Sequence, residues 1–148
     1  MKLIFTKGAA KHDTLEVLRP GMPAERVQCP KQRIIPHDMV HYAVEHTLQA
    51  RGFLGRVKDG ERAVLAMAPD DESAAVERLV EVFQGDEWSG GGSSTADIID
   101  LYRVTCQARS CTPLPLDGVA IAAVKSAIAD LTHRWQATPI GGAMVLDL

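Results

Sequence analysis

The sequence contains few of the features that mark specialised classes of protein. Aromatic residues make up 5% of the 148 positions, so we expect a mainly aliphatic core. No apolar run approaches the roughly 20 residues that cross a bilayer, so no membrane-spanning role is expected. The basic residues are scattered and the formal net charge is -3. A nucleic-acid partner, which requires clustered Lys and Arg, is therefore not expected either.

Cysteine is also scarce, and its number is odd. The chain has Cys29, Cys106 and Cys111, which do not suggest a framework of paired disulfides. The apolar run near the start of the chain, within Lys2–Thr6, is far too short for a signal peptide. Together these observations predict a protein of the reducing cytoplasm.

What the chain does have is the composition of a soluble globular protein. Hydrophobic residues account for 46% of the sequence and charged residues for 24%. Its length fits one domain, residues 1–148, and a domain of this size typically buries about 68 to 70% of the surface that its unfolded chain exposes. The fold should therefore need neither disulfides nor a structural metal.

Four segments have the pattern of β-strands. Lys2–Thr6 and Thr14–Arg19 are rich in strand-forming residues, and the turn residues of Pro20–Pro23 follow the second segment. Ala24–Cys29 alternates polar and apolar residues, which gives a strand with one buried face. Ala143–Leu148 can form a last strand that pairs with the first. The sequence thus predicts a small antiparallel sheet.

Between these strands the hydrophobic period becomes helical. Apolar residues at helical spacing predict a helix over Pro36–Arg51, with Gly52 as the left-handed residue that ends it. Three more helices are predicted to begin at Asp70, at Ser94 or Thr95, and at Asp117. Phe53–Met67 is ambiguous between short strands and a short helix, and the glycine-rich segment Gly85–Ser94 is expected to be a loop. The predicted fold class is therefore α+β, with the small antiparallel sheet packed against about four helices.

The segment Pro36–His46 contains three of the five histidines and two carboxylates. On a helix, His37 and His41 lie one turn apart on the same side, which is the spacing that places two imidazoles on one metal ion. A helical wheel puts both at the edge of the apolar stripe, between core and solvent. Such a border favours the neutral imidazole that a metal requires. His37 and His41 are the predicted ligands of zinc or another divalent metal.

Glu45 shares this edge but lies too far along the helix to join the same ion. At a rise of about 1.5 Å per residue, it is about 12 Å from His37 along the axis. We therefore expect Glu45 to orient a ligand from outside the coordination shell, or to be solvated. The third ligand should come from another segment. The candidates are Glu72, Glu77, Glu81, Asp97, Asp100, His12 and His133.

The segment His37-Asp38-Met39-Val40-His41 resembles the His-Glu-x-x-His motif of the zincin metallopeptidases. This resemblance implies a metal-dependent hydrolase in which Asp38 replaces the glutamate that serves as general base. Asp38 is one methylene shorter than that glutamate. The longer segment Pro36–Glu45, placed after a β-rich N-terminus, resembles a group of small uncharacterised bacterial proteins, and this second resemblance implies no activity.

The same residues also fit a purely structural helix. In this interpretation Asp38 is the N-cap, His37 is its exposed neighbour, and the helix only packs. The protein would then be a non-catalytic interaction or small-ligand-binding module whose working surface lies elsewhere. A homodimer is compatible with both hypotheses, and the sequence identifies no protein or small-molecule partner.

Overall fold

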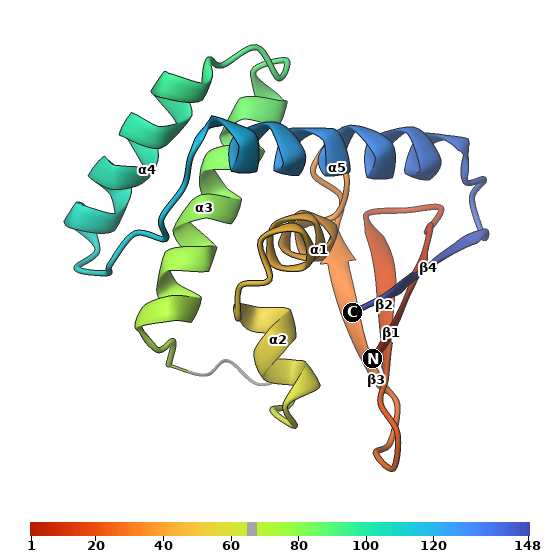
Figure 1. The fold of residues 1–148 in the computed structure, drawn as a ribbon. Coiled ribbons are helices and arrows are strands. Elements are labelled where there is room, and N and C mark those ends of the chain that lie inside the picture. Colours follow the sequence, from red (N-terminus) through yellow and green to blue (C-terminus); the bar gives the residue numbers. More distant parts are fainter. Residues whose placement is uncertain (65–67) are drawn as a thin grey trace.

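The computed structural model describes residues 1–64 and 68–148. These residues form four strands and five helices (Figure 1). The strands are β1 (Lys2–Thr6), β2 (His12–Leu18), β3 (Glu25–Pro30) and β4 (Ala143–Asp147). The helices are α1 (His37–Leu48), α2 (Phe53–Lys58), α3 (Asp71–Trp88), α4 (Thr95–Ala108) and α5 (Gly118–Ala137). None of the described helices is both long and apolar enough to cross a membrane.

The sheet is antiparallel with the strand order β3-β2-β1-β4. The last strand pairs with the first, as predicted, with Val145 opposite Ile4. Side chains alternate along each strand, so Leu3, Phe5 and Leu15 are fully buried on one face while their neighbours point to the other. Helices cover only the buried face (Figure 1). The α+β fold class predicted from the sequence is confirmed.

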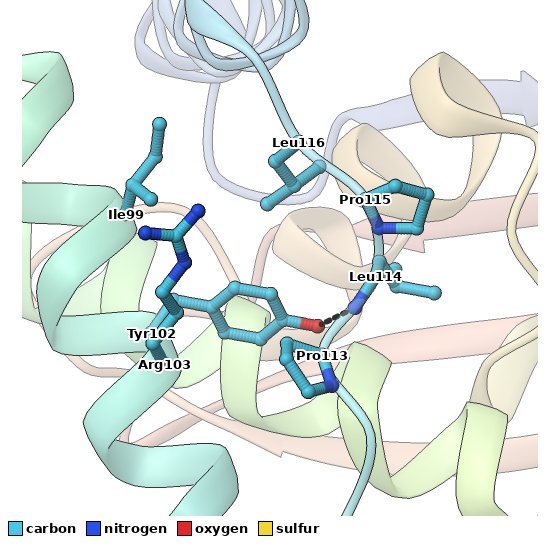
Figure 2. Close-up of a pocket in the computed structure, with 7 residues that line it drawn as sticks. All are labelled: Ile99, Tyr102, Arg103, Pro113, Leu114, Pro115 and Leu116. Carbon is cyan, nitrogen blue, oxygen red and sulfur yellow. Dashed lines mark hydrogen bonds between the residues drawn. The ribbon is translucent and has the colours of Figure 1, made fainter.

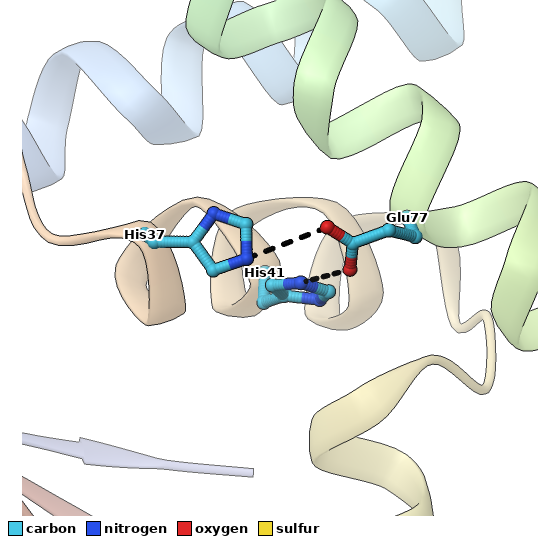
Figure 3. A group of neighbouring side chains, drawn as sticks. All are labelled: His37, His41 and Glu77. Carbon is cyan, nitrogen blue, oxygen red and sulfur yellow. Dashed lines mark ion pairs between the residues drawn. The ribbon is translucent and has the colours of Figure 1, made fainter. Parts of the chain in front are cut away.

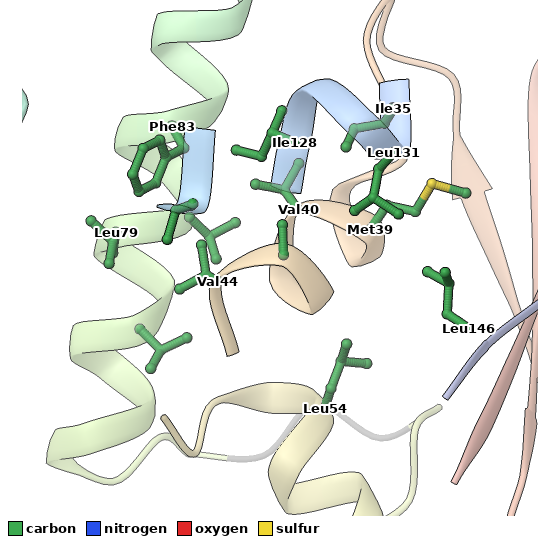
Figure 4. Close-up of a cluster of buried hydrophobic side chains, with 14 of the residues drawn as sticks. Ile35, Met39, Val40, Val44, Leu54, Leu79, Phe83, Ile128, Leu131 and Leu146 are labelled. Carbon is green, nitrogen blue, oxygen red and sulfur yellow. The ribbon is translucent and has the colours of Figure 1, made fainter. Parts of the chain in front are cut away.

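Helix α1 lies at the centre of the helical layer, where it packs against α2, α3 and α5. Its apolar stripe is completely buried among the side chains of α3 and α5 (Figure 4). Val40 and Val44 belong to this stripe, and Leu79 and Phe83 of α3 belong to the same core. The central position explains why a polar residue on α1 that faces inward must find a partner on a neighbouring helix.

The end of α1 differs from the prediction. The left-handed residue after the helix is Gln49, with φ 52°, and not Gly52. Glycine at position 52 serves a different purpose, because a Cβ there would lie 2.3 Å from Glu45 Oε1 and 2.4 Å from Val76 Cγ1. Gly52 thus provides the space into which the Glu45 carboxylate fits. It precedes α2, which forms the first part of the ambiguous segment Phe53–Met67; residues 65–67 lie outside the described residues.

Helix α3 continues through Gly85 to Trp88, whereas the sequence predicted a loop from Gly85. Tertiary contacts outweigh the cost of about 1 kcal/mol that glycine carries inside a helix. Asp86 is buried and accepts a hydrogen bond from the Ser93 amide. The Trp88 indole donates to the carbonyl of Gln32, which ties the end of the helix to the segment before α1.

The extended segment between α4 and α5 is anchored by one tyrosine. The Tyr102 hydroxyl donates to the Ala75 carbonyl at 3.1 Å and accepts from the Leu114 amide at 2.9 Å (Figure 2). Tyr102 is almost fully buried, so both bonds are shielded from water. The hydroxyl therefore links α3, α4 and the segment that leads to α5.

Candidate metal centre

Three side chains from two helices converge at one point. His37 and His41 come from α1, and Glu77 comes from the facing side of α3 (Figure 3). His41 Nε2 lies 2.8 Å from Glu77 Oε2, and His37 Nε2 lies 3.5 Å from Glu77 Oε1. One nitrogen of each histidine and one carboxylate oxygen all lie within 4.8 Å of one another. These three residues, called the His37 cluster below, could hold a metal ion.

Packing between α1 and α3 sets this geometry. Val40 and Val44 on α1 and Val80 on α3 are fully buried in the shared core, which fixes the separation of the two helices. His37 and His41 flank Val40 in sequence and lie at the edge of its stripe. On α3, Glu77 likewise lies at the edge of the apolar stripe, near Val80. The cluster therefore lies at the margin of the core.

The second ring nitrogen of His41 is held by Glu45. Its Nδ1 lies 3.1 Å from Glu45 Oε1, and an ionised carboxylate can only accept, so Nδ1 is the donor. The same carboxylate accepts from the backbone amides of Leu54 at 3.0 Å and Gly55 at 2.7 Å. Glu45 is 2% exposed and His41 is 1% exposed. The carboxylate is thus fixed by α2, and it fixes the His41 ring in turn.

The second ring nitrogen of His37 is held by Gln84 of α3. A chain of hydrogen bonds shows which atom of this pair donates. The Ile35 carbonyl can only accept, so the Gln32 atom that lies 2.8 Å from it is the amide NH₂. The same NH₂ lies 3.0 Å from Gln84 Oε1, and this oxygen lies 3.1 Å from His37 Nδ1. His37 Nδ1 is therefore the donor, which leaves the lone pair of a neutral ring on Nε2, the nitrogen that faces Glu77.

Electrostatics in the cluster favour a bound cation. Burial alone would lower the pKa of His41, but its hydrogen bonds to Glu45 and Glu77 outweigh burial and raise the pKa to about 10. Burial alone would raise the pKa of Glu77, but the hydrogen bond and the charge of His41 outweigh it, so the Glu77 pKa lies below its ordinary value. Without metal His41 is therefore charged at neutral pH, and the expectation of a neutral imidazole is wrong because Glu45 and Glu77 outweigh burial. The proton on His41 Nε2 faces Glu77, and a metal ion bound there would displace it.

One side of the cluster is open to solvent. The His41 side chain is almost fully covered, and Phe53 packs on it edge to face with ring centroids 5.9 Å apart. In contrast, the side chains of His37 and Glu77 are 42% and 32% exposed. A small molecule or water can therefore approach on the side of His37 and Glu77.

Some of the predicted site residues meet at the cluster, and others lie around it. His37 and His41 converge with Glu77, which was one of seven candidates for the third ligand. Glu45 lies behind His41, at the place where it can orient that ring. Gln84 was not predicted. Gln84 follows Glu77 by seven residues, which is close to two helical turns, so both lie at the same edge of the apolar stripe of α3. This shared edge is the signal that could have identified Gln84.

Asp38 lies apart from the His37 cluster. Its carboxylate oxygen is 3.6 Å from Cys29 Sγ on β3, and it does not belong to the cluster. Burial and the nearby Asp38 carboxylate raise the pKa of the Cys29 thiol to about 12. The suggestion that Asp38 caps the helix is wrong, because Pro36 holds the cap position and no side chain caps α1.

Comparisons of this chain with protein-family models, curated proteins and solved structures found no match. The function is therefore argued from the geometry of the site.

Replacing Gly52 with Ala tests how far the site depends on Glu45. The added Cβ overlaps the Glu45 carboxylate and Val76, so we expect a loss of about 2 to 4 kcal/mol in the free energy of unfolding. Urea denaturation measures this loss. Gly55→Ala is the matched control, since its Cβ would meet no atom closer than 3.1 Å. Equal stabilities of the two variants would contradict the role given to Gly52.

The His41 ion pairs predict how stability depends on pH when metal is removed by a chelator. The pKa of His41 is raised from 6.5 to about 10 on folding, so its stabilisation is complete below pH 6.5 and is lost as the pH rises towards 10. Urea denaturation at pH 6.5, 7.5 and 8.5 should therefore show a falling free energy of unfolding, by at most about 1.4 kcal/mol per pH unit.

The variant His41→Asn should lose this slope, whereas His46→Ala, which removes an exposed imidazole from the same helix, should keep it. A stability that is constant or rises over this range in the unmodified chain would contradict the charged state of His41.

Proposed function

We propose that this protein binds a divalent metal ion through His37 Nε2, His41 Nε2 and the carboxylate of Glu77, and that it acts as a metal-dependent hydrolase. The observation that carries the proposal is the orientation of both imidazoles. Each donates Nδ1–H to a fixed acceptor, Glu45 or Gln84, and directs Nε2 to Glu77. Ligand histidines in metal sites are almost always oriented in this way.

The separations between the donor atoms support the proposal. Zinc bonds of about 2.0 to 2.1 Å at tetrahedral angles separate neighbouring ligand atoms by about 3.3 Å. The two nitrogen–oxygen distances to Glu77 are 3.5 and 2.8 Å, on either side of this value. All three donor atoms lie within 4.8 Å of one another, and an ion would draw the two exposed side chains, His37 and Glu77, closer to His41. Two histidines and one glutamate are also a donor set that catalytic zinc sites use.

The open side supports a catalytic function over a structural one. Structural zinc sites have four protein ligands, whereas catalytic sites have three and leave a position for water or substrate. Among the described residues, the cluster contains three ligand side chains. A divalent ion held by His37, His41 and Glu77 would supply Lewis-acid chemistry, lowering the pKa of a bound water and polarising a substrate carbonyl or phosphoryl group.

The chain supplies the geometry for this chemistry. Glu45 and Gln84 hold the two rings so that neither must reorient when a ligand binds. Phe53 packs edge to face against His41, and the exposed approach to the cluster is on the side of His37 and Glu77. The role of Asp38 as general base stays a prediction; in this structure its carboxylate is directed to Cys29.

Calorimetric titration of the full chain with Zn²⁺ or Mn²⁺ tests the proposal. We expect one ion per chain and the release of about one proton from His41, detected by comparing buffers with different ionisation enthalpies. His37→Ala, His41→Ala and Glu77→Gln should each weaken binding by more than about 100-fold, and Gln84→Ala, which removes the acceptor for His37, by about 10- to 100-fold.

Two variants serve as controls. His46→Ala removes an imidazole from the exposed side of the same helix, and Asp38→Asn changes the neighbouring carboxylate; both should retain the affinity. Absence of binding at millimolar metal, or equal affinity in His46→Ala and His41→Ala, would contradict the proposal. The helix would then serve packing, as in the alternative of a non-catalytic module.

A further inference from the structure

A second pocket lies beside the segment that precedes α1, and its lining residue Gln32 donates to Gln84, the residue that holds the His37 ring. It has a volume of about 670 Å³, within the range of small-molecule sites. Its walls come from the residue after β1, the start of β2, the segment before α1, the end of α3 and the last turns of α5, which Figure 1 labels. We call it the Arg33 pocket. Its main lining residues are Lys7, Lys31, Arg33, Thr132, Trp135 and Ile140.

Three cationic side chains line the Arg33 pocket, against two carboxylates, Asp13 and Glu87. Asp13 is already engaged, because it accepts from the Gly8 amide at 2.9 Å and lies 3.7 Å from Lys31 Nζ. Lys7 Nζ donates to the carbonyl of Trp135 and lies 4.8 Å from the centroid of its ring. This contact offsets the negative end of α5 beside the pocket. The excess of one positive charge favours an anionic ligand.

Arg33 carries the strongest sign of function in this pocket. Its φ is 70°, in the left-handed region that non-glycine residues rarely adopt. The side chain is exposed, and within residues 1–64 and 68–148 no ion pair or hydrogen bond holds it. Backbone strain without a local contact that explains it is typical of residues kept for binding. A guanidinium in this state is available for an anionic group, which it can bind in a bidentate manner.

Two further features define the rest of the ligand. The Thr132 hydroxyl is buried and has no hydrogen-bond partner among the described residues, so a polar atom brought by a ligand would satisfy it. Ile34, Trp135 and Ile140 add apolar walls. Pockets of mainly apolar lining with a few polar groups bind molecules that combine an apolar body with a charged group.

We propose that the Arg33 pocket binds a small organic anion, with its carboxylate or phosphate group between Lys7 and Arg33 and its apolar body against Trp135 and Ile140. The proposal does not depend on a metal in the His37 cluster. It assigns a second ligand site to the chain, formed by different residues and open to a different class of molecule.

NMR titration of the full chain tests this proposal with four probes: phenyl phosphate, 3-phenylpropionate, inorganic phosphate and neutral 3-phenylpropanol. The two organic anions should give saturable shifts of the Trp135 indole signal and of the amides of residues 31–35. Comparing them shows whether the site prefers phosphate or carboxylate. Inorganic phosphate and the neutral alcohol should each bind at least about tenfold more weakly, since each lacks one part of the recognised chemistry.

Variants separate binding from folding. Arg33→Gly removes the guanidinium and relieves the strain at this φ, so the melting temperature should stay equal or rise while the affinity for the organic anions falls about tenfold. Lys7→Met and Thr132→Val should each weaken binding by about threefold to tenfold. Arg109→Ala, which removes an exposed arginine elsewhere, should change nothing. The proposal is overturned if no probe gives saturable shifts or if Arg33→Gly binds as tightly as the unmodified chain.

Discussion

The site depends on one buried carboxylate. Glu45 is 2% exposed, and its two oxygens accept from the His41 ring and from the first amides of α2. Removing such an acceptor leaves buried donors unpaired, at a cost of about 1 to 3 kcal/mol for each. The same carboxylate fixes the position of α2, the orientation of His41 and the requirement for glycine at position 52. Local stability and the chemistry of the site are therefore connected through a single side chain.

The geometry suits the cluster to hold either a proton or a metal ion. A proton on His41 Nε2 and a divalent cation at the same place interact favourably with the same atoms, since both are positive charges beside Glu77. The core between α1 and α3 sets the distance between the helices, so the ligands need not be brought together by the ion. Such preorganisation is what a metal site requires if one position is to remain open for a substrate.

The sequence predicts the fold well because most of its elements depend on periodicity. The strands at both ends of the chain, and the helices with Val40 and Leu79 at their centres, follow from local patterns alone. The prediction is wrong at Gly85, where α3 continues and Asp86 bonds to Ser93. It is also wrong at the end of α1, where Gly52 gives space to Glu45 and does not end the helix. Two of the three candidate ligands follow from the spacing of His37 and His41. Glu77 cannot be selected from the seven candidates by sequence alone. Its position beside the two histidines depends on how α1 and α3 cross, which tertiary packing determines.

X-ray absorption at the zinc edge of the zinc-loaded chain tests the central claim most directly. Binding at His37, His41 and Glu77 predicts two imidazole nitrogens and one or two further oxygens at about 2.0 to 2.2 Å from the zinc. It also predicts that one imidazole is lost from the zinc shell in His37→Ala, whereas the shell in His46→Ala is unchanged. A shell without imidazole scattering, or one that contains sulfur, would contradict binding at His37, His41 and Glu77.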